Sequence, residues 1–117
     1  MHELKRQIKQ FIRERDWEQY HAPKNLAMAL SVEVTEILEI FQWKDPAAEL
    51  NAEEQQALRE EIGDVMIYLI ELADHFGIDP VKAAEHKLSL NEKKYPAEVV
   101  RGRADKYTEY SGPEENS

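Results

Sequence analysis

Residues 31–43 read SVEVTEILEIFQW, and their apolar spacing predicts an α-helix that carries acids on its buried face. At about 100° per residue, Glu36 lies within the same stripe as Glu33. The apolar members of that stripe are Leu26, Ala29, Leu30, Ile37 and Ile40. A buried carboxylate without a partner costs roughly several kcal/mol, so this helix requires a compensating group nearby.

The segment LREEIGDVMIYLIELADHF, residues 58–76, repeats the pattern. Glu61 and Asp64 again stand three residues apart on a predicted apolar stripe. The other members of that stripe are Leu58, Val65, Tyr68, Leu72, His75 and Phe76. Three further acids fall outside the two stripes and are expected to face solvent: Glu39, Glu60 and Glu71. Two successive helices therefore each point an acid pair inward.

Periodicity and capping signals predict four helices and no strand, which indicates an all-α, four-helix bundle fold. The expected bounds are 2–16, 25–43 with Asn25 as N-cap, 51–76 with an Asn51/Glu54 capping box and a stop at Gly77, and 79–94 opening on Asp79 and Pro80. Residues 1–109 are expected to form one domain, and 110–117 a flexible tail. Ile67 and Ile70, which lie off the core stripe, predict a second buried face and therefore an oligomer.

Composition excludes several classes of protein. The chain has no run of about 18 apolar residues and begins with a charged segment, so we expect no membrane span, no signal peptide and a cytoplasmic location. A formal charge of −9 argues against binding to a nucleic acid polymer. With no cysteine in the chain, metal ligands would be carboxylates, histidines or backbone oxygens, which suit hard cations.

Four converging carboxylates would be balanced by two divalent cations, and their hard oxygen ligands favour Mg²⁺ or Mn²⁺. The sequence leaves open two alternatives to a Mg²⁺ or Mn²⁺ site. The acids could lie at the ends of the bundle or pair with Arg and Lys from neighbouring helices. A di-iron bundle is less favoured, because it requires Glu-x-x-His motifs that neither acid pair contains.

The ordered acids Glu33-x-x-Glu36 and Glu61-x-x-Asp64 resemble the metal signature of the MazG-like, all-α nucleoside triphosphate pyrophosphohydrolases. Three flanking segments resemble the small single-domain branch that includes dCTP pyrophosphatase: PKNLAMALSVEVTEILEIFQW (23–43), EEIGDVMIYLIELAD (60–74) and NEKKYPAEVVRGRADKYTE (91–109). The resemblance implies Mg²⁺-dependent hydrolysis of dCTP or a related deoxynucleotide to the monophosphate and pyrophosphate. It also implies a homodimer or homotetramer.

Residue roles follow from this resemblance as hypotheses. Glu33, Glu36, Glu61 and Asp64 would be the catalytic metal ligands, with Glu36 preferred for orienting the attacking water. Lys87, Asn91 and Lys94 share a helix face by their i, i+4, i+7 spacing and would meet the triphosphate. The full expected substrate-binding set is Trp17, His21, Lys24, Asn25, Trp43, Tyr68, Lys87, Asn91, Lys94 and Tyr95.

Two other functions compete with this one. The chain could be a noncatalytic helical oligomerisation module, in which the inward acids pair with basic side chains. It could also hydrolyse another pyrophosphate-linked metabolite, such as phosphoribosyl-ATP. Aromatic residues in polar surroundings, including Trp17 and Trp43, favour a nucleobase pocket and hence a deoxynucleotide.

Overall fold

The computed structural model describes residues 1–101, and over that range the fold is all-α, as predicted. The elements are α1 (His2–Glu14), the 3₁₀-helix η1 (Glu18–Tyr20), α2 (Pro23–Phe41), α3 (Ala52–His75), α4 (Pro80–Lys94) and α5 (Ala97–Val100). Within these residues every helix is too short or too polar to span a bilayer. The two short helices, η1 and α5, were not expected from the sequence.

The chain divides into two compact units, Met1–Pro80 and Val81–Ser117. The first unit holds α1, η1, α2 and α3, and the second holds nearly all of α4 together with α5. The expectation of one domain over 1–109 stays a prediction, and the expected tail at 110–117 lies outside the described residues.

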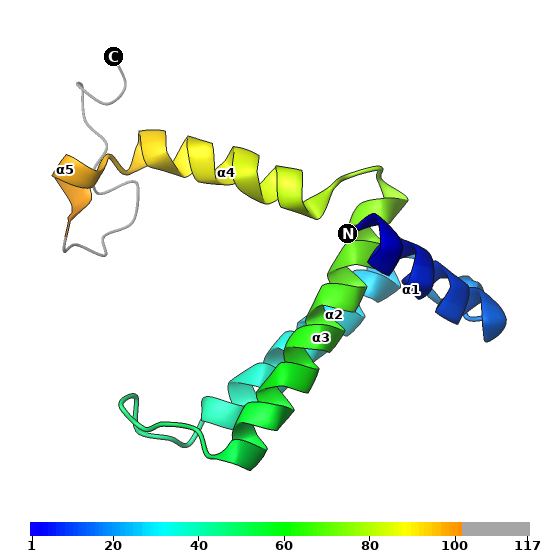
Figure 1. The fold of residues 1–117 in the computed structure, drawn as a ribbon, viewed down its shortest axis with the longest axis horizontal. Helices are drawn as coiled ribbons and strands as arrows, with labels where there is room; N and C mark the ends of the chain where they lie inside the picture. Colours follow the sequence, from blue (N-terminus) through cyan, green and yellow to red (C-terminus); the bar gives the residue numbers. More distant parts are fainter. Residues whose placement is uncertain (102–117) are drawn as a thin grey trace. The chain divides into compact units, whose positions relative to one another are not determined.

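Helices α2 and α3 form the scaffold of the first unit. They run side by side and are joined at one end by the loop that follows α2 (Figure 1). Leu26 of α2 is fully buried, as the apolar stripe predicts. An ion pair between Lys44 and Glu54, 2.6 Å apart, ties the connecting loop to the first turn of α3. The two acid-bearing stripes therefore face each other.

Helix α1 covers a second face of α3. Ile70, only 1% exposed, is buried in one cluster with Ile8 and Ile12 of α1. Lys5 and Lys9 reinforce this contact by approaching Asp74 to 3.1 and 2.9 Å. A second buried face therefore exists at Ile70, as predicted. It is covered by α1 of the same chain, whereas the sequence had suggested a contact between subunits.

This packing overturns the expectation that Glu71 faces solvent. Its side chain is only 9% exposed, because Glu71 lies next to Ile70 on the face that α1 and the following loop cover. Glu39 and Glu60 are exposed, as predicted.

The predicted start of α2 was wrong by two residues. Pro23 occupies its first turn, where a missing N–H costs nothing, and Ala22 precedes it in extended backbone. Asn25 is therefore inside the helix rather than its cap, and its side-chain amide donates to the Tyr20 carbonyl at 3.4 Å. The helix also ends at Phe41, two residues before the predicted Trp43.

The capping box of α3 is confirmed. The Asn51 side chain accepts from the Glu54 N–H at 2.8 Å, and the Glu54 carboxylate accepts from the Asn51 N–H at 2.9 Å. At the other end, Gly77 takes a φ of +65°, the left-handed conformation that glycine adopts without strain.

We expect Asn51→Ala to lower the free energy of unfolding by about 1 kcal/mol, since the Glu54 N–H at the start of α3 loses its side-chain acceptor. Urea denaturation followed by circular dichroism measures this. Asn51→Asp keeps the acceptor and should stay close to the wild type; equal losses in both variants would contradict the capping role.

Candidate functional site

Acids from α2 and α3 meet between the two helices. One carboxylate oxygen from each of Glu33, Glu61 and Asp64 lies within 4.8 Å of the other two. Glu33 comes from α2, whereas Glu61 and Asp64 come from one turn of α3. Helical spacing of i, i+3 and the packing of α2 on α3 are what place these three groups together.

Glu36, one turn after Glu33 on α2, completes the group of four acids. Its carboxylate beside Glu61, together with burial and the nearby Glu33, raises the pKa of Glu61 to about 7. Burial raises the pKa of Glu33 as well, with further contributions from the charges of Glu36 and Asp64. Neighbouring carboxylates resist simultaneous ionisation, so Glu61 keeps its proton to a higher pH than an ordinary glutamate.

The cluster fits a hard divalent cation. Oε2 of Glu33 and Oε2 of Glu61 are shielded from water and have no hydrogen-bond partner among the described residues. Within Met1–Pro80 the ion pairs involve other acids, so the expected alternative of Arg or Lys compensation is not seen in that unit. Carboxylate oxygens alone are the donor set that Mg²⁺ and Mn²⁺ prefer.

Metal-free protein should lose stability as the pH rises from about 4.5 to about 7. Glu61 has a higher pKa in the folded chain than its ordinary 4.5, so the folded state binds the proton more tightly. That contribution is fully present below about 4.5 and is lost as the pH passes through about 7.

Thermal unfolding in EDTA at pH 5 and pH 8 tests this prediction against Glu61→Gln, which mimics the protonated acid. The variant should match the wild type at pH 5 and exceed its Tm at pH 8. Adding Mg²⁺ should reverse the order at pH 8. A wild type and variant that respond identically to pH in EDTA would contradict the acid cluster as the cause.

An apolar pocket of about 340 Å³ opens beside the acids. Its lining residues come from α1, the following loop and α3: Gln7, Ile8, Phe11, Ile12, Trp17, His21, Asp64, Ile67, Tyr68 and Glu71. Asp64 belongs to both the pocket and the acid cluster. A ligand in the pocket would therefore lie next to a cation held by the acids.

Trp17 reaches this pocket because the chain reverses after α1. Asp16 takes a φ of +54°, and the Trp17 N–H then donates to the Ile12 carbonyl at 3.1 Å. The Trp17 ring packs edge-to-face against Phe11 with centroids 5.9 Å apart, and the Arg15 guanidinium lies 3.7 Å above the Phe11 ring. The indole is held by these contacts, yet 43% of the residue stays exposed.

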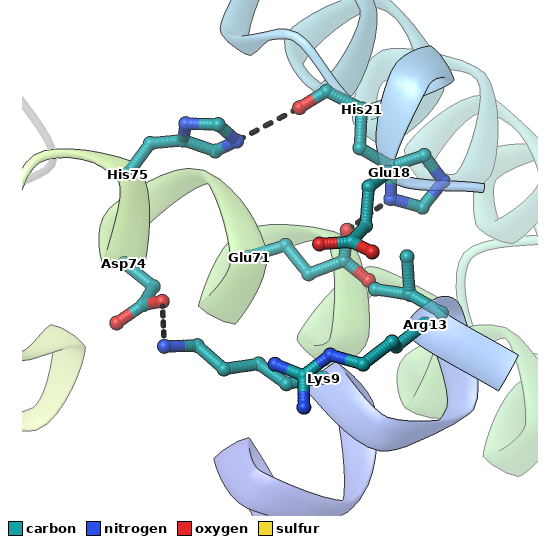
Figure 2. Close-up of a pocket in the computed structure, with 8 residues that line it drawn as sticks. Lys9, Arg13, Glu18, His21, Glu71, Asp74 and His75 are labelled. Atoms are coloured by element: carbon teal, nitrogen blue, oxygen red, sulfur yellow. Dashed lines mark hydrogen bonds and ion pairs between the residues drawn. The ribbon is translucent and has the colours of Figure 1, made fainter. Parts of the chain in front are cut away.

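A second, more polar pocket of about 260 Å³ shares residues with the first (Figure 2). It is lined by Lys9, Ile12, Arg13, Glu18, His21, Glu71, Asp74 and His75. His21 and Glu71 line both pockets, and their Nδ1 and Oε2 atoms are 2.5 Å apart. The His21–Glu71 pair is therefore part of the lining of both pockets.

The other predicted substrate-binding residues belong to α2, the loop after it and the second unit. Trp43 is 88% exposed just beyond α2 and does not line the pocket of its own chain. Lys24 and Asn25 are exposed in the first turn of α2. In the second unit, the charge of Lys94 lowers the pKa of Lys87, which places these two lysines close together on α4. Tyr95 follows α4, and its N–H donates to the Asn91 carbonyl at 2.8 Å.

Sequence reasoning missed Gln7, Phe11 and Glu71 as pocket residues. Phe11 is 47% exposed and lines the apolar pocket. Phe11 stands six residues before Trp17, close to the predicted end of the first helix, and that spacing was a usable signal. No local signal marks Glu71, since its partner His21 is 50 residues away.

Several known proteins are similar to this chain. The MazG-like family model matches residues 28–110. The dCTP pyrophosphatase 1 proteins of Rattus norvegicus and Homo sapiens are each 42% identical over 113 residues, covering 93% of this chain and 66% of theirs. A crystal structure of a pyrophosphatase from Archaeoglobus fulgidus is 43% identical with a TM-score of 0.71, covering 82% of this chain and 92% of that one. This chain thus corresponds to about two thirds of the length of those curated relatives.

Proposed function

The chain belongs to the MazG-like family, and from that premise we propose that it hydrolyses a deoxynucleoside triphosphate, dCTP or a close analogue, to the monophosphate and pyrophosphate. The observation that carries the proposal is the adjacency of an acid cluster and an aromatic pocket that share Asp64. A nucleotide has the matching parts, since its phosphates need cations and its base needs a flat apolar surface. The relatives named dCTP pyrophosphatase 1 support the same choice of substrate.

Glu33, Glu61 and Asp64 would hold Mg²⁺, or Mn²⁺ in its place, with Glu36 next to them. When bound, the metal would neutralise the charge that develops on the phosphate oxygens. Glu36 lies outside the set of three oxygens that are mutually within 4.8 Å, so it is our candidate for orienting the attacking water. Its carboxylate can accept the hydrogen bond that such a water donates.

The pocket would take the base. Trp17 offers an indole face held by Phe11, and Tyr68 adds a second ring from α3. Burial, with the charges of Glu33, Glu71 and Asp64, raises the pKa of Tyr68, so its phenol keeps the proton and can donate it. An apolar pocket with few polar groups is the usual form of a nucleobase site.

Lys87 and Lys94 would bind the triphosphate. Two ammonium groups close together on an exposed helix repel each other, which is the cause of the lowered pKa of Lys87. A polyphosphate relieves that repulsion, and Asn91 between the lysines could donate to the same ligand. These assignments rest on the properties of α4 itself.

A second copy of the chain is part of this proposal. Trp43 is too exposed to act as a core residue and does not line the pocket of its own chain. We propose a homodimer or homotetramer in which exposed apolar side chains of α2, such as Met28, Val32 and Leu38, become buried. Sedimentation analysis of the purified protein tests this, and a monomer at micromolar concentration would contradict it.

Incubation with dCTP, dATP, dUTP and ATP in the presence of Mg²⁺ tests the activity. We expect monophosphate and pyrophosphate in equal amounts, with dCTP the best substrate, and no product in EDTA. Diphosphate with orthophosphate would indicate a different bond cleaved. A parallel incubation with phosphoribosyl-ATP tests the alternative substrate. No product from any of these compounds would favour the noncatalytic module, and turnover of phosphoribosyl-ATP alone would favour hydrolysis of another pyrophosphate-linked metabolite.

A further inference from the structure

His21 is held at two points by residues one turn apart on α3. Glu71 Oε2 lies 2.5 Å from Nδ1 of the His21 ring, and His75 Nε2 lies 2.8 Å from the His21 carbonyl oxygen. Figure 2 shows both contacts, with Glu71 directed at the ring and His75 at the backbone. We call these two contacts the His21 clamp. They fix the side chain and the main chain of His21, which lies in the loop between η1 and α2.

The clamp lies on the same face of α3 as the acids and the aromatic pocket. Asp64, Tyr68, Glu71 and His75 follow one another at spacings of three or four residues, so they form one row along the helix. His21 packs beside Tyr68, with ring centroids 6.4 Å apart. One helix face therefore carries an acid of the metal cluster, a ring of the pocket and the support of His21.

The partner of Nδ1 determines what Nε2 can do. An ionised carboxylate only accepts hydrogen bonds, so the ring nitrogen that faces Glu71 carries a proton. In a neutral imidazole the other nitrogen then has a lone pair and is an acceptor. Among the residues that the structure describes, Nε2 of His21 has no hydrogen-bond partner, and His21 lines the apolar pocket.

We propose that Glu71 is a positioning residue that makes His21 Nε2 an acceptor for the exocyclic amino group of the base, so that the pocket prefers amino-bearing over keto-bearing bases. This inference rests on the proposed function and extends it from a nucleotide to a class of base. Cytosine and adenine have an amino donor at the relevant edge, whereas uracil and thymine have a carbonyl oxygen there. With uracil or thymine, Nε2 of His21 would face a carbonyl oxygen. Both groups are acceptors, so no hydrogen bond forms and the loss is not compensated inside the pocket.

Burial and the hydrogen bond from His21 act in opposite directions on the charge of Glu71. Burial raises the pKa of Glu71, and the hydrogen bond from His21 opposes this effect. The polar pocket beside Glu71 is also lined by four charged residues: Lys9, Arg13, Glu18 and Asp74. Lys9 forms an ion pair with Asp74.

Two variants and one control test the proposal. Glu71→Ala removes the acceptor for Nδ1–H, whereas Glu71→Gln keeps one in its amide oxygen. Glu18→Gln changes a carboxylate that lines only the polar pocket, so it serves as the matched control. For each protein, kcat and KM are measured with dCTP and dUTP at about pH 8, and the ring nitrogens of His21 are assigned by ¹⁵N NMR.

In Glu71→Ala we expect the dCTP to dUTP ratio of kcat/KM to fall about tenfold, through KM for dCTP rather than kcat, as one hydrogen bond is lost. The proton of His21 should redistribute between Nδ1 and Nε2 in the same variant. Glu71→Gln should restore most of the ratio, and Glu18→Gln should leave it unchanged.

An equal loss of activity on both nucleotides in Glu71→Ala would overturn the proposal, because it would assign Glu71 a purely structural role. A wild-type ring protonated on Nε2 would overturn it as well. A wild-type protein that hydrolyses no nucleotide would instead refute the proposed function, and the base preference with it. Melting temperatures of the variants establish that each one is folded.

Discussion

Replacing Asp64 by Asn, or Glu36 by Gln, is expected to lower kcat for dCTP about a thousandfold while the protein stays folded. Asp64 contributes to the group of three oxygens, and Glu36 lies beside Glu61. Each substitution removes a negative charge from a site whose cation supplies several kcal/mol of transition-state stabilisation, and about 1.4 kcal/mol corresponds to a factor of ten. Both variants keep the shape of the side chain, so the loss would be chemical.

The matched control is Glu60→Gln. Glu60 is adjacent to Glu61 in sequence but is exposed and outside the acid cluster, so its neutralisation should change kcat by less than about twofold. Circular dichroism and the thermal midpoint show whether the variants retain the fold. A variant at Asp64 or Glu36 with wild-type kcat would refute the assignment of that residue, and a thousandfold loss in Glu60→Gln would show that net charge rather than position is responsible.

The acid cluster could be predicted from the sequence because it depends on local periodicity. Glu33 with Glu36, and Glu61 with Asp64, each stand on an apolar helical stripe, and such stripes pack against each other in an antiparallel helix pair. The same reasoning anticipated the buried Leu26 and the capping box at Asn51. Each of these features is determined within about one or two turns of helix.

The His21–Glu71 pair could not be predicted in this way. Glu71 lies off the core stripe of its own helix, and only the packing of α1 and its following loop onto α3 buries it. The burial of Ile70 has the same cause, although the sequence suggested a subunit contact there. Long-range packing of this kind has no periodic signature, because it depends on the path of the loop between α1 and α2.

Of the four side chains predicted to bind the base, three lie together and one lies apart. Trp17, His21 and Tyr68 line one pocket, whereas Trp43 lies beyond the C-terminal end of α2 and is exposed. A tryptophan in a polar segment indicates a surface that another molecule covers, but it does not distinguish a ligand from a second protein chain.

Trp17→Ala is expected to raise the KM for dCTP about 30-fold with a small effect on kcat. The indole is the largest aromatic surface of the pocket, and removing an aromatic side chain that stacks on a base costs about 1–3 kcal/mol. The KM changes because the base is bound equally in the ground state and the transition state, far from the bond that breaks. Steady-state kinetics over a range of dCTP concentrations measure both constants.

Trp17→Phe and Tyr20→Ala are the controls for this prediction. Trp17→Phe keeps a ring against Phe11 and should raise KM less than about fivefold, since stacking depends on ring area. Tyr20 lies three residues further on, is 62% exposed and does not line the pocket, so its truncation should leave KM unchanged. If Trp17→Ala lowered kcat and left KM unaltered, Trp17 would act on the arrangement of the acids through Phe11 and α1 instead of binding the base.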